Sequence, residues 1–533
     1  MSPADLRLDY VSPLPPVRSG IADYSRDLLP VLAAECDLRV VAVPGQEVAA
    51  EFSSTWAPVD ASELGSEGRL PLFQMGNNPH HEEVQKLALS RVGVVTLHDV
   101  VLHHLLVEST LARSDFKSYA RRLEDDHGWI GELVAKARFW GELSSAAMFG
   151  LPVHRKLVRR QRGVLVHSRW AADQLLEDCP DVEVRVVPMG MPLPEPISVA
   201  AARAFREAKG LPTERPLLGS FGFQTPIKRT TVAIRALAER GLEDAHLVIA
   251  GDVSPEIELE VLAAELGVED RVHVTGFLPY DEFETAITAC DLCVNLRYPT
   301  AGETSASLLR VLALGRPALV SDYAQFRELP GEVALRVALG DEEPAELARA
   351  AGEVLASPGR LEEMGAAARR LVATEHDLAT AASAIAEACL ELRDFEPPDS
   401  RPVRVPPPTT LLWRDLPGHI EVSGAETPWP EGEQRSLGVH LTNRGVARWL
   451  ATKERPGGVQ LGVEWRSEIG GGAMEEHWRE LPRSLDTGDS YDFLLSLRRP
   501  HGSRFLVIEP HIENLSGLSG LGGPSWVGEF PGG

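Results

Sequence analysis

The chain is 533 residues long, too long for one hydrophobic core, and this length predicts about three domains. It carries 53 Lys plus Arg against 78 Asp plus Glu, and the net charge of -25 argues against binding to nucleic acid. No apolar run approaches the roughly 20 residues that cross a bilayer, and the five cysteines give no disulfide framework. The first residues lack the basic start and apolar core of a signal peptide, so we expect a cytoplasmic protein.

Short apolar runs alternate with helical stretches over most of the chain. In the first part we expect strands at 6–14, 38–44, 70–76, 93–100 and 163–168, and a helix at 19–35. A second series of strands is expected at 216–223, 245–252, 271–277, 292–298 and 317–322, with amphipathic helices between them. This alternation predicts two α/β domains, each built on a parallel sheet.

The C-terminal part has a different character. Residues 396–410 contain six prolines in fifteen positions and are expected to form an extended linker. The short runs that follow alternate with turn residues and predict a small β-sandwich, with Trp449, Trp465 and Trp478 as core anchors. The predicted division is 1–190 and 191–375 for the two α/β domains, 376–394 for a helix packing back across them, 395–410 for the linker and 411–533 for the sandwich.

Ligands of open parallel sheets bind at the carboxyl ends of the strands, and the first candidate segment there contains Gly20 and Ile21. The glycine follows the first strand and precedes a helix, so the backbone can approach a ligand and the helix N-terminus favours an anion. A turn that requires a positive φ explains the same glycine, and both interpretations stay open.

The second candidate segment contains Lys228 and Arg229, at the start of a helix in the second α/β domain. Two cations at a helix N-terminus are disfavoured by its dipole. A bound diphosphate would offset this cost, so we favour a phosphate site over a solvated surface pair.

The third candidate segment runs from Arg297 to Ser305 and precedes another helix. Thr304 or Ser305 can cap that helix, and the free backbone amides at its start can bind phosphate. Glu303 is an acceptor-only carboxylate suited to the hydroxyls of a sugar or ribose, although a first-turn acid is also common in helices. Spacing alone leaves both interpretations of Glu303 open.

His98, followed by Asp99, ends an apolar strand of the first domain, so we expect His98 to point into the cleft between the domains. The neighbouring histidines do not follow the spacing of a known zinc site, and we expect no metal. Cys290 and Cys293 lack a second cysteine pair and are expected to be buried core residues.

These segments, taken in order, resemble a family-four glycosyltransferase of the GT-B fold over about residues 5–394. The resemblance implies two facing Rossmann-like domains and transfer of a sugar from a nucleoside-diphosphate sugar to a glycan, lipid-linked or other hydroxyl acceptor. It also implies retention of the anomeric configuration without a required metal or other cofactor. The C-terminal segment resembles the immunoglobulin-like modules of some bacterial members.

The resemblance also implies roles for single residues. Lys228 falls on the lysine that neutralises the donor diphosphate and His98, beside Asp99, on a histidine near the reacting sugar. Gly20 and Ile21 fall on the phosphate loop. Phe277 and Leu278 fall on the loop that contacts the nucleotide base.

The chain departs from the family pattern at two places. Phe223 stands where most members have an arginine, and Arg229 is a candidate for the missing charge. The family's two glutamates, which are separated by seven residues, fall on Gly302 and Arg310. We therefore assign donor hydroxyls to Glu303 and leave Arg310 as a candidate for the diphosphate or for pairing with a partner.

Two alternatives remain at this stage: a sugar-nucleotide epimerase of similar fold, or a degenerate, non-catalytic sugar-nucleotide-binding scaffold. The basic segment 154–160 raises a further hypothesis, weak association with the cytoplasmic face of a membrane, although a solvated charged face is the more common role of such a run.

Overall fold

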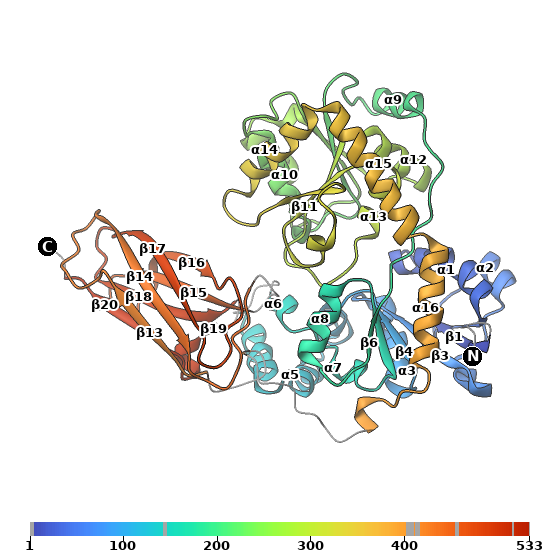
Figure 1. Ribbon diagram of the computed structural model, residues 1–533, viewed down its shortest axis with the longest axis horizontal. Helices are drawn as coiled ribbons and strands as arrows, with labels where there is room; N and C mark the ends of the chain where they lie inside the picture. Colours follow the sequence, from blue (N-terminus) through green and yellow to red (C-terminus); the bar gives the residue numbers. More distant parts are fainter. Residues whose placement is uncertain are drawn as a thin grey trace.

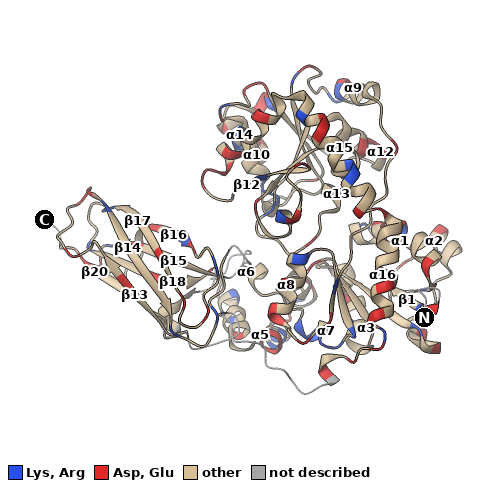
Figure 2. Ribbon diagram, viewed as in Figure 1, with Lys and Arg blue, Asp and Glu red and all other residues tan. Residues whose placement is uncertain are grey.

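The computed structural model describes residues 5–141, 147–400, 410, 416–452, 458–513 and 516–531. Two α/β domains lie one above the other in Figure 1, and a β-sandwich lies beside the first of them. Most of the predicted linker, residues 401–409, lies outside the described residues. Acidic and basic residues are interspersed along all three parts of the chain (Figure 2).

The first α/β domain has a six-stranded parallel sheet of order β2-β1-β3-β4-β5-β6. The three strands β3, β4 and β5 are buried along their whole length, which explains why each reads as a continuous apolar run. The strands are β1 (Arg7–Val11), β2 (Asp37–Val41), β3 (Leu70–Met75), β4 (Val94–Leu97), β5 (Gly163–Val166) and β6 (Val184–Val186). The helices are α1 (Gly20–Glu35), α2 (Ala50–Trp56), α3 (Glu82–Ser90), α4 (His103–Ser109), α5 (Phe116–Phe139), α6 (Ala147–Gly150), α7 (Arg155–Val158) and α8 (Arg169–Asp178).

The second α/β domain repeats this plan with a sheet of order β12-β11-β10-β7-β8-β9. The order reverses between β7 and β10, and such a switch point is where open parallel sheets bind ligands. The strands are β7 (Leu217–Phe221), β8 (His246–Ala250), β9 (Val272–Gly276), β10 (Leu292–Asn295), β11 (Ala318–Ser321) and β12 (Ala334–Val337). The helices are α9 (Val199–Ala208), α10 (Thr230–Leu237), α11 (Leu259–Glu265), α12 (Tyr280–Ala289), α13 (Ala306–Ala313), α14 (Glu343–Leu355) and α15 (Pro358–Glu375).

Helix α16 (Leu378–Leu392) returns the chain to the first domain, where it packs against α1. Asp377 caps its start by accepting hydrogen bonds from the backbone N–H groups of Ala379 and Thr380. Near its end Leu392 lies against Gly163, where a Cβ would come within 2.5 Å of the leucine. The helix therefore ties the end of the second domain to the sheet of the first.

The C-terminal part is an antiparallel β-sandwich, so the predicted fold class is confirmed for all three parts. One sheet contains β13 (Gly418–Ser423), β14 (Gln434–Asn443) and β17 (Ser490–Arg498); the other contains β16 (Ala473–Glu480), β15 (Val459–Arg466), β18 (Phe505–Ile512), β19 (Ser516–Gly517) and β20 (Trp526–Glu529).

The tryptophans divide between the core and the surface of the sandwich. Trp449 and Trp465 are fully buried, as predicted, and Trp429 fills the core beside them. The prediction for Trp478 was wrong, because its side chain is 39% exposed. Trp478 pairs with Gly462 on the outward face of the sheet, and its ring lies over the glycine, where a Cβ would approach it to 2.7 Å.

The sandwich is not an isolated body. Buried apolar side chains of α4 and α5 form one continuous cluster with those of the sandwich. At a separate place Tyr298 Oη, in the second α/β domain, donates to Glu513 Oε1 at the end of β18, at 2.5 Å. The sandwich therefore contacts both α/β domains. Among the described helices, none has the length and apolar character needed to span a membrane.

Candidate active site

The two α/β domains meet where the chain continues beyond β4 and β10. The backbone N–H groups of Val100 and Val101 both donate to the carbonyl oxygen of Ala301, at 2.8 and 2.9 Å. Gly302 turns the chain with a φ of +82°, and a Cβ there would lie 3.0 Å from the side chains of Val100 and Trp170. The glycine allows this close approach of the domains, and it places the residues after β10 against the residues after β4.

Two cations lie at the switch point of the second sheet: Lys228, which is partly buried, and Arg297, which is buried. Lys228 follows β7 and Arg297 follows β10, and these strands are neighbours. Lys228 Nζ donates to the carbonyl oxygen of Phe221 at 2.6 Å, and the Arg297 side chain is only 8% exposed. Burial, together with the charge of Arg297, lowers the pKa of Lys228 well below its ordinary value. Two cations held out of water beside each other favour the binding of an anion.

Glu303 is the acid closest to this pair. Its carboxylate accepts from Arg297 Nε at 3.3 Å, from Thr300 Oγ1 at 2.8 Å and from the backbone N–H of Ala301 at 2.9 Å. Among the described residues, no carboxylate lies within ion-pair distance of Lys228. One carboxylate thus faces two cations and holds the loop that contacts the first domain.

Asp99 faces Glu303 from the first domain. Its Oδ2 accepts from the backbone N–H of Asn77 at 2.8 Å. Burial first, and then the charge of Glu303, raise the pKa of Asp99 to about 7. Asp99 therefore retains a proton up to nearly neutral pH, so it adds little negative charge beside Glu303.

His98 is held between two partners. Its Nε2 lies 2.8 Å from Gln74 Oε1, and its Nδ1 lies 3.1 Å from Nε2 of His167. Burial lowers the pKa of His98 well below its ordinary value, so the ring is neutral. Tyr24 of α1 packs edge-on against it, with ring centroids 5.3 Å apart. Since both ring nitrogens are engaged, the structure fixes the orientation of His98 firmly.

Gly20 and Ile21 begin α1 on the same side of the first sheet. Gly20 does not adopt a positive φ, so the turn itself does not require a glycine. A Cβ there would meet nothing within 4 Å, which leaves open space at the capped helix start. Ile21 packs against Gly76, next to His81. These observations favour the interpretation in which Gly20 makes room for a ligand.

Arg229 is engaged elsewhere. Its guanidinium forms an ion pair with Glu343, the first residue of α14, with Nε 3.0 Å from Oε1. The Glu343 side chain is fully buried, and Arg229 is 25% exposed. The ring of Tyr298 lies beside the guanidinium, 5.9 Å away. A role for Arg229 in donor binding stays a prediction. A donor phosphate would have to compete with Glu343 for the guanidinium of Arg229.

Thr304 and Ser305 line a hollow of about 610 Å³ that both domains enclose. Ser305 caps α13 by accepting from the backbone N–H of Leu308 at 3.3 Å. Glu328 also lines this hollow, and its carboxylate accepts from the backbone N–H groups of Arg169 and Trp170 at the start of α8. The predicted capping role is thus present at a helix start that faces a space between the domains.

The guanidinium of Arg310 stacks on the ring of Tyr280, 4.4 Å from its centroid, so its observed partner is an aromatic ring at the start of α12. Phe277 and Phe223, which follow β9 and β7, are 70% and 57% exposed, whereas Leu278 is buried. Their roles beside a nucleotide stay predictions.

Two residues of the site received no role from the sequence. Arg297 was recognised only as the start of a segment, although its place directly after a buried strand was a usable signal. His167 follows β5 in the same way, and its contact with His98 depends on strands far apart in sequence. Within the described residues, no cluster of three or more His, Cys, Asp or Glu side chains is arranged to hold a metal ion.

Parts of the chain are similar to a known protein family and to characterised proteins. Residues 202–371 match the family model of glycosyl transferases group 1. The 2-deoxystreptamine glucosyltransferase of Streptomyces kanamyceticus is 29% identical over 214 residues, 39% of this chain and 54% of that protein. The MMP alpha-(1->4)-mannosyltransferase of Mycolicibacterium hassiacum is 27% identical over 245 residues, 44% of this chain and 56% of that protein. The matches span about half the length of these curated relatives.

Solved structures show the same fold. The sucrose-phosphate synthase of Thermosynechococcus elongatus has a TM-score of 0.50 at 18% identity and covers 73% of this chain and 99% of its own. A glycosyltransferase of Rickettsia africae has a TM-score of 0.51 at 13% identity, with the same two shares. At these identities the likeness concerns the fold alone. Residues 202–371 are therefore similar to glycosyl transferases group 1, the two α/β domains have the GT-B fold, and a β-sandwich follows them.

Proposed function

We propose that the protein is a glycosyltransferase that moves a sugar from a nucleoside-diphosphate sugar to a hydroxyl group of an acceptor. The observation that carries the proposal is the pair of cations, Lys228 and Arg297, at the switch point of the group 1 domain. A diphosphate would supply a negative charge to Lys228, which has no ion-pair partner among the described residues, and Arg297 would share that charge with Glu303. The group 1 match does not favour the epimerase or the scaffold alternative.

In the proposed reaction, Lys228 and Arg297 stabilise the negative charge that grows on the departing nucleotide. The amides at the start of α13, beside Thr304 and Ser305, are placed to assist. Gly20 leaves space for the diphosphate from the first domain, and the domain contact at Ala301 excludes water. We propose that Asp99 and the neutral His98 orient the sugar, and that Glu303 binds donor hydroxyls.

The donor sugar and the acceptor are further parts of the proposal. The relatives' names include a glucosyltransferase, an N-acetyl-D-glucosaminyltransferase and a mannosyltransferase, which supports a hexose donor. We propose a glycan, lipid-linked or other hydroxyl acceptor and retention of the anomeric configuration. No metal or other cofactor is required in this proposal.

We propose only a weak association of the protein with an anionic membrane surface. In the basic segment 154–160, Lys156 lies 3.3 Å from Asp125, and Arg159 forms ion pairs with Asp181 and Asp399. These pairs reduce the free positive charge that the segment offers to anionic lipid. Co-sedimentation with anionic vesicles tests the idea, and an absence of binding at low salt would remove it.

The experiment that tests the function is a transfer assay with a panel of nucleotide sugars. We expect turnover with at least one donor. Lys228→Ala should lower kcat/KM by a factor that corresponds to about 2 kcal/mol, because one charge-assisted contact is lost. The fold should persist, since Lys228 makes no ion pair in the described part of the chain.

Lys209→Ala is the matched control, because Lys209 lies in the same domain and pairs with the exposed Glu282 at 2.8 Å. It should retain full activity. If Lys228→Ala keeps the kinetics of the wild type, Lys228 is not in the donor site. If no donor is bound or consumed, the proposed function is wrong.

A further inference from the structure

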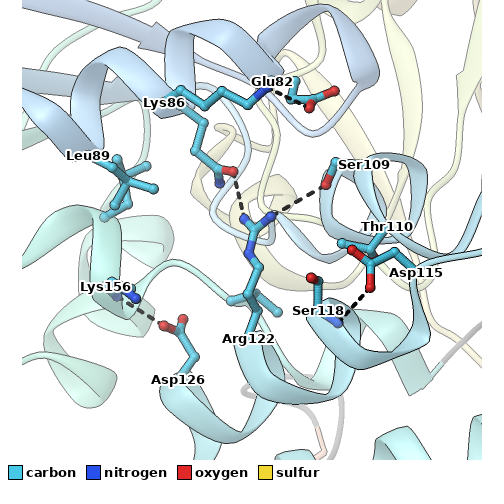
Figure 3. A pocket seen from close by; sticks show the side chains of 13 residues that line it. Glu82, Lys86, Leu89, Ser109, Thr110, Asp115, Ser118, Arg122, Asp126 and Lys156 are labelled. Atoms are coloured by element: carbon cyan, nitrogen blue, oxygen red, sulfur yellow. Dashed lines mark hydrogen bonds and ion pairs between the residues drawn. The ribbon is translucent and has the colours of Figure 1, made fainter. Parts of the chain in front are cut away.

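A second pocket lies in the first α/β domain, among α3, α4, α5 and α7, and has a volume of about 360 Å³ (Figure 3). The side chain of Arg122, from α5, points into it. Its Nη2 donates to Gln85 Oε1 at 2.7 Å, and its Nη1 lies 3.4 Å from Ser109 Oγ. Both partners are neutral. Burial lowers the pKa of Arg122.

Three carboxylates line the same pocket, but each is engaged by another group. Glu82 pairs with Arg113 and with Lys86. Asp115 caps α5 by accepting from the backbone N–H of Ser118 at 3.0 Å.

The third carboxylate, Asp126, accepts from the backbone N–H groups of Arg155 and Lys156 at 2.8 and 3.1 Å. Among the described residues, none of the three carboxylates comes within ion-pair distance of Arg122, which thus lacks a directly paired counter-ion. The charges of Asp126 and Glu82 act on its pKa from a longer distance, and burial outweighs them.

We propose that this pocket binds a small molecule bearing a phosphate monoester, with Arg122 as the principal contact. A guanidinium presents paired N–H donors that match phosphate oxygens, and a half-buried one lacking a counter-ion gains most from an anion. Lys86 and Lys156 also line the pocket, but they are paired with Glu82 and Asp125, so Arg122 is the main positive charge that a ligand meets. The pocket volume of about 360 Å³ is about twelve times that of a water molecule, which occupies about 30 Å³, and is larger than one phosphate group. The remaining space can hold a sugar or a similar carbon skeleton.

The site is separate from the proposed catalytic site. Its lining includes none of the residues that we assign to the donor or to the reaction. The inference therefore stands whether or not the protein transfers a sugar, and a binding measurement can test it independently of activity.

The test is isothermal titration and thermal unfolding of the full chain with inorganic phosphate and with glucose 6-phosphate, compared with sodium chloride at equal ionic strength. We expect both phosphates to raise the unfolding temperature and chloride not to do so. Arg122→Gln should weaken phosphate binding about ten-fold or more, because a charge-assisted contact is lost. Arg121→Gln is the matched control, since Arg121 is the exposed neighbour on the same helix, and it should bind like the wild type.

A second variant keeps the test decisive if Arg122→Gln fails to fold. Gln85→Glu places a carboxylate where Gln85 already accepts from Arg122, and so supplies the missing counter-ion. We expect it to be more stable than the wild type in phosphate-free buffer and to lose the stabilisation by phosphate.

Vesicles of phosphatidylcholine with and without phosphatidic acid distinguish a lipid headgroup from a free phosphate ester. Binding to phosphatidic acid that depends on Arg122 would identify the lipid as the source, and binding of glucose 6-phosphate alone would identify a soluble ligand. The proposal is overturned if phosphate stabilises the wild type no more than chloride, or if Arg122→Gln and Gln85→Glu respond to phosphate like the wild type.

Discussion

At the scale of single residues, burial changes the protonation of the groups that line the site. The pKa of Asp99 is raised and that of Lys228 is lowered, so the neutral form of each is favoured. An incoming diphosphate would favour the charged form of Lys228. The electrostatics of the site are thus arranged for a bound anion rather than for the unliganded protein.

The raised pKa of Asp99 makes stability depend on pH. Between about pH 4, near the ordinary value of an aspartate, and pH 7 the folded protein holds a proton at Asp99 that the unfolded chain has lost. Stability from this group is therefore greatest at low pH and decreases as pH rises through this window. We expect Asp99→Asn to gain stability relative to the wild type as pH increases from 4 to 8, measured by urea unfolding.

Asp23→Asn serves as the control, because the Asp23 side chain is 59% exposed. The difference in the free energy of unfolding between Asp23→Asn and the wild type should change little over the same pH range. A difference for Asp99→Asn that stays constant with pH would contradict the burial of Asp99.

At the scale of elements, the connection between β7 and α10 combines two cations with different roles. Lys228 faces the switch point, whereas Arg229 ties the start of α10 to the start of α14 through the buried Glu343. Arg229 itself adopts a positive φ of 51°, which turns its side chain away from the direction of a regular helix start. Of these two adjacent residues, Lys228 is therefore the expected ligand contact, whereas Arg229 makes a structural contact.

We expect Glu343→Ala to lower the free energy of unfolding by about 3 kcal/mol, because a partly buried arginine loses its counter-ion. Arg229→Ala should also destabilise the protein, and by more than Lys228→Ala does. Thermal unfolding of the three variants, alongside donor KM, measures the difference. If Arg229→Ala instead raises the donor KM as strongly as Lys228→Ala without loss of stability, Arg229 belongs to the donor site.

At the scale of the whole molecule, the sandwich contacts the two α/β domains in different ways. It shares a buried apolar cluster with α4 and α5 of the first domain. Its described contact with the second domain includes the polar bond from Tyr298 to Glu513. Tyr298 follows Arg297 directly, so the sandwich touches the segment that carries a cation of the candidate site.

A chain that ends at Asp394 tests whether the sandwich is separable. The proline-rich linker predicts that removal of the sandwich leaves activity on a small acceptor intact. The shared cluster predicts instead that removal exposes apolar side chains of α4 and α5, and so lowers the unfolding temperature and increases binding of a hydrophobic dye. We expect this destabilisation; an unchanged unfolding temperature would show that the cluster contributes little.

Tyr298→Phe separates the polar contact from the apolar one, because it removes only the hydroxyl group that Glu513 accepts. We expect it to leave the unfolding temperature within about 2 °C of the wild type, since one partly buried hydrogen bond contributes about 1 kcal/mol. A change in donor KM with this variant would link the sandwich to the donor site.

Much of the fold could be predicted from the sequence, because local patterns carry it. The buried strands β3, β4 and β5 read as continuous apolar runs, and the sandwich strands are separated by turn residues. The strand ends also pointed to Lys228, His98 and the segment before α13, since ligands gather at that edge of a parallel sheet.

Only the tertiary structure decided which of these residues act together. The strand order places β7 beside β10, and this brings Arg297 to Lys228 from about seventy positions away in sequence. The partner of Arg229, the contact of His98 with His167 and the exposure of Trp478 also depend on elements that no local pattern connects. Periodicity determines which residues are buried in an element, whereas pairing across elements depends on the free energy of packing the whole chain.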